Sequence, residues 1–150
     1  MTITMAAMQS LEGRMFVLWG NHFDALMAIT FVSCLRQSGI ETKIVGIHGR
    51  TAVGHQGVTL TADVTLGEAM ASCFAIDYII VPCHSPHFGS LHNDPRISTL
   101  LTAAHQNGTR FIAGLLSAVD APLFPVPIHR IESYVEPHEY TERVKKIIQE

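Results

Sequence analysis

The sequence predicts an α/β protein: a three-layer sandwich in which a largely parallel sheet lies between helices. Short, mostly apolar segments at 15–19, 43–47, 78–82 and 110–116 are typical of strands covered on both faces. Segments with apolar residues at helical spacing separate these strands along the chain. Such alternation indicates βαβ units with right-handed crossovers.

The first βαβ unit begins at the strand 15–19. A helix is expected from Asp24 to Arg36, where apolar residues recur every three to four positions. Ser38-Gly39 ends this helix, because glycine is favoured just after a helix C-terminus. The strand 43–47 completes the unit.

The middle of the chain combines a small antiparallel element with further α/β units. Residues 57–63 alternate in polarity and suggest a short antiparallel excursion. Thr65 to Glu68 has the pattern of a capping box that opens a short helix. After the strand 78–82, Asp94-Pro95 caps and starts a helix that continues from Arg96 to Gln106 and ends at Asn107-Gly108.

The C-terminal part begins with the strand 110–116. The proline-rich segment 122–127 must be extended, because proline fixes its own φ and restricts the residue before it. A polar helix is expected at 139–149. Residues 1–13 are expected to be a flexible leader, and residues 14–150 a single domain.

Composition narrows the class of protein. Of the 150 residues, 47% are hydrophobic and 15% are charged, and the mean hydropathy is +0.25. Oligomerisation, a bound partner or a large buried sheet accounts for this apolar surplus. The net charge of −3 without a basic stripe argues against direct nucleic-acid binding. No secretory signal or membrane-length apolar run is present, and Cys34, Cys73 and Cys83 lack a paired spacing, so we expect reduced thiols and a cytoplasmic location.

Several segments together resemble a known family. They are, in order, Phe23-Asp-Ala-Leu26, the pentapeptide at 36–40, the thirteen residues at 57–69, Asp77 to Pro82, and a gap-free stretch from Leu91 to Ala118. This series is similar to the ThiJ/PfpI family of the class I glutamine amidotransferase-like superfamily. The resemblance implies a flavodoxin-like fold, shortened at the C-terminus.

The positions that carry the family's chemistry have changed. Relatives act as hydratases, deglycases, glyoxalases or peptidases through a cysteine and an acid. The resemblance puts Leu116 at the position of the cysteine and Met27 at that of the acid. It also puts Cys83-His84 where the family has two glycines whose backbone amides line an oxyanion site. The resemblance therefore implies that the family's reaction is lost.

Other chemistry remains open at the same edge of the sheet. Cys83 follows a parallel strand, and the adjacent His84 would favour a reactive thiolate. The alternative is a small side chain packed under a loop. His84, His87 and His92 have permissive spacing for zinc, but ordinary histidines on a surface loop explain them better. Ser117 lacks the flanking glycines of a nucleophile elbow.

A ligand pocket is expected where the strands end. Its polar lining is predicted to comprise Asn21, His22, Asp24, Cys83, His84, His87 and Ser117. No cofactor is expected. We predict a non-catalytic binding or regulatory protein, which resembles the sensor half of AraC-type regulators without their DNA-binding helices. The alternative is a hydrolase or lyase that uses Cys83 or a histidine-bound metal.

The first helix also predicts a homodimer. It has no charged residue between Asp24 and Arg36, so its apolar side chains need cover on more than one face. Relatives commonly pair through this helix and the loop after the second strand, which here carries His48 and His55. We expect Phe31 or Val32, whichever faces outward, to lie at a two-fold interface.

Overall fold

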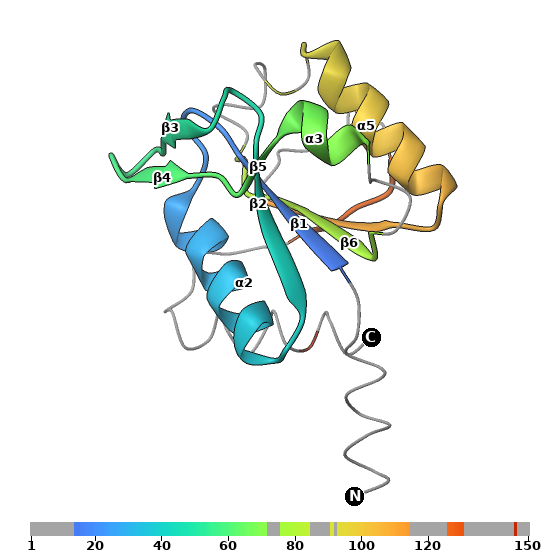
Figure 1. Cartoon of the computed structure of the whole chain (residues 1–150), viewed down its shortest axis with the longest axis horizontal. Coiled ribbons are helices and arrows are strands. Elements are labelled where there is room, and N and C mark those ends of the chain that lie inside the picture. Colours follow the sequence, from blue (N-terminus) through green and yellow to red (C-terminus); the bar gives the residue numbers. More distant parts are fainter. Residues whose placement is uncertain are drawn as a thin grey trace, which may run out of the picture.

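The computed structural model describes residues 14–71, 76–84, 91, 93–114, 126–130 and 146 (Figure 1). Its elements are β1 (Arg14–Trp19), α2 (Ala25–Gln37), β2 (Glu41–Gly46), β3 (Thr51–Val53), β4 (Thr59–Thr61), β5 (Val64–Thr65), α3 (Leu66–Met70), β6 (Tyr78–Val81), α5 (Pro95–Gln106), β7 (Arg110–Ala113) and β8 (His129–Arg130).

A parallel sheet forms the centre of the molecule. Its described strands follow the order β5-β2-β1-β6-β7-β8, and each neighbouring pair is parallel. β1 has a strand on either side, β2 and β6. Helix α2 lies on one face, whereas α3 and α5 lie on the other (Figure 1). The predicted flavodoxin-like three-layer sandwich is confirmed, and the carboxyl ends of β1, β2, β6 and β7 share one edge.

The central strands are buried on both faces, which explains their unbroken apolar sequences. Val17, Leu18 and Trp19 in β1 are fully inaccessible to solvent. On the α2 side the core includes Phe31 and Leu35, which are also fully buried. A sheet covered in this way has only its strand ends for binding polar molecules.

The described helices begin at or next to the residues that the sequence predicted. Asp24 caps α2 by accepting a hydrogen bond from the Met27 backbone N–H, and Thr65 forms the expected capping box with Glu68. Asp94 caps α5, which begins at Pro95. The antiparallel excursion is the hairpin of β3 and β4.

Several strand limits differ from the prediction, and two of the differences have a clear cause. β2 begins at Glu41 rather than at residue 43, because its pairing with β1 extends to Arg14, whose side chain forms a 3.2 Å ion pair with Glu41. β6 ends at Val81, because Pro82 has no N–H to continue the ladder.

The predicted outward position on α2 is wrong. Phe31 is fully buried and Val32 is 9% exposed within a single chain, because both lie on the side that packs into the core. Ile29, at 46% exposure, is the large apolar residue that faces outward. One chain therefore already covers most of this helix.

Some predictions lie outside the described residues. They concern the leader 1–13, Cys73, most of the proline-rich segment, the helix 139–149 apart from Lys146, and the end of the strand 110–116. Of the helices described, none has both the length and the apolar character needed to cross a bilayer.

Candidate functional site

Two polar side chains meet at the carboxyl edge of the sheet. The turn after β1 leads to Asp24, and the chain leaving β6 through Pro82 leads to His84. The Asp24 backbone N–H donates to the Pro82 carbonyl at 2.8 Å, which fixes the two segments side by side. This pairing brings His84 Nε2 within 2.6 Å of Asp24 Oδ2. We call these two residues the Asp24–His84 pair.

Asp24 is a buried carboxylate surrounded by donors. Its side chain is 3% exposed. Oδ1 accepts hydrogen bonds from the Met27 backbone N–H at 3.2 Å and from Gln56 Nε2 at 2.7 Å. Burial alone would raise the pKa of Asp24, but the hydrogen bonds from His84, Gln56 and Met27 outweigh it and hold the pKa well below its usual value. Asp24 is therefore ionised and fixed in orientation at neutral pH.

Gln56 is a site residue that the sequence reasoning missed. It lies in the turn between β3 and β4, and its amide bridges the start of α2. Nε2 donates to Asp24, while Oε1 accepts from the Ala25 backbone N–H at 2.9 Å. The His55 backbone N–H donates to the Phe23 carbonyl at 2.7 Å and holds the turn in place. No motif marks Gln56, because its role depends on how the hairpin folds back over the helix start.

The imidazole of His84 fills the space beside the end of β7. A Cβ atom placed on Gly114 would lie 2.6 Å from His84 Nδ1 and 2.7 Å from the Cys83 carbonyl oxygen. Only glycine fits at position 114 while the ring remains there. The His84 side chain is 19% exposed, so part of the ring remains accessible to a ligand.

The Cys83 thiol lies beneath this edge. The residue is 1% exposed, and Sγ lies 3.7 Å from the His84 carbonyl oxygen. Reactive cysteines are typically partly exposed beside positive charge, whereas buried thiols are typically inert. The geometry favours the packed-thiol interpretation of Cys83.

Asn21 and His22 lie in the turn before Asp24, at the same edge. Both are exposed and both hold the turn to β3. Asn21 Oδ1 accepts from the Val53 backbone N–H at 3.4 Å, and the His22 backbone N–H donates to the Val53 carbonyl at 3.0 Å. His22 has a φ of 69°, a left-handed conformation that is uncommon outside glycine.

The remaining predicted site residues divide into two groups. Met27 is fully buried, so the position that the resemblance gives to the family's acid belongs to the apolar core here. His87, His92, Leu116 and Ser117 lie outside the described residues. Across the part of the chain that the structure describes, no three His, Cys, Asp or Glu side chains gather as a metal site would require.

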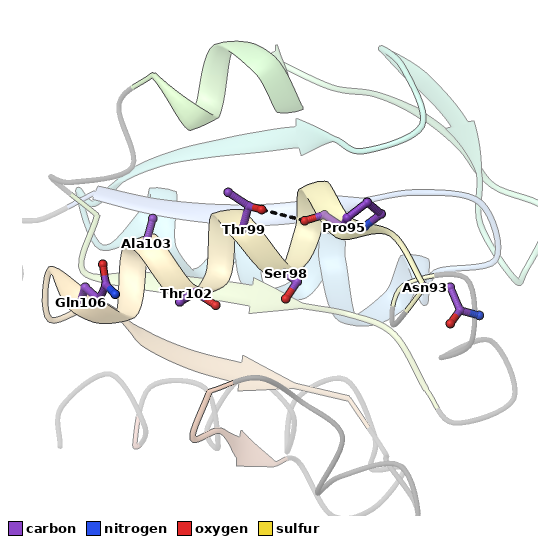
Figure 2. A pocket seen from close by; sticks show the side chains of 7 residues that line it. All are labelled: Asn93, Pro95, Ser98, Thr99, Thr102, Ala103 and Gln106. Carbon is purple, nitrogen blue, oxygen red and sulfur yellow. Dashed lines mark hydrogen bonds between the residues drawn. The ribbon is translucent and has the colours of Figure 1, made fainter.

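A separate hollow of about 780 Å³ runs along α5 (Figure 2). Its described lining is Asn93, Pro95, Ser98, Thr99, Thr102, Ala103 and Gln106. The Thr99 hydroxyl donates to the Pro95 carbonyl at 2.9 Å, and none of the described lining residues is charged. The Asp24–His84 pair is therefore the better candidate for a functional site.

Comparison with known proteins gives structural relatives only. No family model and no curated protein matches the sequence. The fold is similar to oxidised DJ-1 of Toxoplasma gondii, with a TM-score of 0.73 and 14% identity over 91% of this chain and 89% of that one. Drosophila melanogaster DJ-1beta gives a TM-score of 0.73 with 13% identity over 92% and 89% of the two chains. A ThiJ/PfpI domain protein of Brachyspira murdochii gives 0.68 with 12% identity over 93% and 95%. The chain therefore has the fold of the DJ-1, ThiJ and PfpI proteins, which confirms at the level of the fold the resemblance drawn from its sequence.

Proposed function

We propose that this chain is a non-catalytic binding or regulatory module, in which the Asp24–His84 pair recognises a small polar ligand. One observation carries the proposal. The His84 ring, held by a buried carboxylate 2.6 Å away, fills the space beside Gly114. In the family that the sequence resembles, positions 83 and 84 are two glycines whose backbone amides line an oxyanion site.

The ionised carboxylate of Asp24 also suits recognition better than the family's reaction. A carboxylate with three hydrogen-bond donors and a lowered pKa is a poor proton acceptor at neutral pH. Its role is to orient the imidazole. An oriented, partly exposed imidazole selects ligands by hydrogen-bond geometry, as the few polar groups of a small-molecule pocket usually do.

Turnover assays test the proposal directly. Wild-type protein incubated with methylglyoxal or a small isonitrile should show no turnover above that of Leu116→Ala. His84→Ala supplies the matched variant at the described site. Robust wild-type turnover that His84→Ala abolishes would overturn the proposal.

The second candidate function is a hydrolase or lyase, and the same 2.6 Å contact favours it. A carboxylate that orients an imidazole is half of a general-base arrangement, which needs a nucleophile such as Cys83 or a metal-bound water. Iodoacetamide labelling of Cys83 across pH tests the first route, and metal analysis of the purified protein tests zinc held by His84 and His87. An inert thiol and no stoichiometric metal would remove this candidate.

We further propose that the module is a cytoplasmic homodimer. The exposed large apolar side chains among the described residues are Ile29, Val53 and Val58, at 46%, 49% and 38%. The first lies on α2 and the others belong to the β3–β4 hairpin and its turn, which lie beside the start of α2 (Figure 1). Relatives commonly pair through the corresponding helix and loop, and a symmetric contact here would cover these side chains. Regulation would then act through a protein partner or a ligand, without direct nucleic-acid or membrane binding.

A further inference from the structure

A histidine outside the proposed pocket holds the turn that leads to Asp24. His48 follows β2, and its Nδ1 accepts a hydrogen bond from the Asn21 backbone N–H at 2.9 Å. The contact is close. A Cβ atom on Gly20 would lie 2.7 Å from the same ring nitrogen. The imidazole is therefore fitted into the turn between β1 and α2.

This geometry requires one protonation state. A backbone N–H can donate only to an unprotonated ring nitrogen, so the ring is neutral and carries its proton on Nε2. Protonation would place an N–H on Nδ1, directly facing the Asn21 N–H. The acceptor would be lost, and two donors would oppose each other.

Burial, more than any charged neighbour, favours the neutral form of the His48 ring. Burial lowers the pKa of His48 below its ordinary value; Asp94 raises it in part, and Arg96 and His22 lower it further. Asp94 and Arg96 lie at the start of α5, where Arg96 bonds both Asp94 and the Ile47 carbonyl. His22 belongs to the turn itself. Acid therefore shifts the ring toward a form that the folded turn does not accommodate.

We infer that His48 is a pH-sensitive latch, whose protonation in mildly acidic solution releases the turn at residues 20–23 from the end of β2. This turn directly precedes Asp24. The latch is a property of the fold and does not depend on the proposed function.

NMR spectroscopy of the full chain tests the inference. In wild type the hydrogen-exchange protection of the Asn21 amide should fall on the order of fivefold between pH 7.5 and pH 4.5, after correction for intrinsic exchange. The fall should have the same midpoint as the titration of the His48 ring, which needs no variant to measure. His48→Gln is the matched control, because its side-chain carbonyl accepts a hydrogen bond without titrating. It should make the protection independent of pH. Constant wild-type protection, or a midpoint different from that of His48, overturns the inference, as does an equal fall in His48→Gln.

Discussion

Gly114 and His84 occupy neighbouring space so closely that a single added carbon at position 114 would lie 2.6 Å from the imidazole Nδ1. The two residues are far apart in the sequence. They meet because β6 and β7 are adjacent parallel strands. The end of β7 thus leaves room for the histidine that follows the neighbouring strand β6.

The first prediction follows from this contact. Gly114→Ala should destabilise the protein by about 1–3 kcal/mol, because the new methyl group overlaps the ring and the Cys83 carbonyl. His84→Ala should relieve only part of this loss, since the carbonyl remains. Urea unfolding of the two single variants and the double variant measures the coupling. A Gly114→Ala protein as stable as wild type would contradict the described position of the ring.

The second prediction concerns acid stability. Asp24 has a lowered pKa in the folded state, so its stabilising effect is complete above its unfolded pKa of about 3.9 and is lost as the pH falls below that value toward the folded pKa. Wild type should therefore lose more stability between pH 5 and pH 2.5 than Asp24→Asn, by on the order of 1–2 kcal/mol. Asparagine keeps the helix cap, which makes the variant a matched control. Urea unfolding midpoints of both proteins at several pH values measure this difference. If both proteins lose the same stability between pH 5 and pH 2.5, Asp24 is not a buried ionised carboxylate.

The third prediction concerns Gln56. Gln56→Ala should cost about 1–2 kcal/mol, because it removes one of the hydrogen bonds to the buried Asp24 Oδ1 and the side-chain acceptor of the Ala25 N–H. Thr61→Ala, at an exposed position on the same hairpin, should change the free energy of unfolding by no more than about 0.5 kcal/mol. Thermal or urea unfolding compares the two. If the two variants are equally stable, Gln56 does not hold the site.

The fourth prediction tests the dimer. Ile29→Glu and Val53→Glu should each shift the protein from dimer to monomer, because a charge would be buried at the contact. Thr102→Glu, exposed on α5 at the other face of the sheet, should leave association unchanged. Light scattering at micromolar protein concentration measures the molar mass of the wild type and of each variant. A monomeric wild type would refute the proposal.

The sequence predicted the features that depend on residues close to one another along the chain. The caps at Thr65 and Asp94 were predicted because a side chain there bonds an amide two or three residues further along the chain. The three-layer fold with a mostly parallel sheet followed from the alternation of buried strands with helices and from the resemblance. The sequence also placed Asp24 and His84 at one edge of the sheet, since the strands before them end there.

The pairing itself required the structure. Asp24 and His84 are 60 residues apart, and the orientation of each side chain depends on the backbone contact of Asp24 with Pro82. Gln56 was missed for the same reason. Phe31 and Val32 were misassigned because a helix with apolar residues on most sides does not reveal which side meets the sheet.

The fluorescence of Trp19 should depend on the position of the β3–β4 hairpin. It is the only tryptophan in the chain, it is fully buried, and its indole N–H donates to the Ala52 carbonyl in β3 at 3.1 Å. Detachment of the hairpin would break that bond and admit water to the ring. The intrinsic fluorescence of the unlabelled protein therefore reports release of the hairpin. The same signal can be recorded during ligand addition, acidification or subunit dissociation.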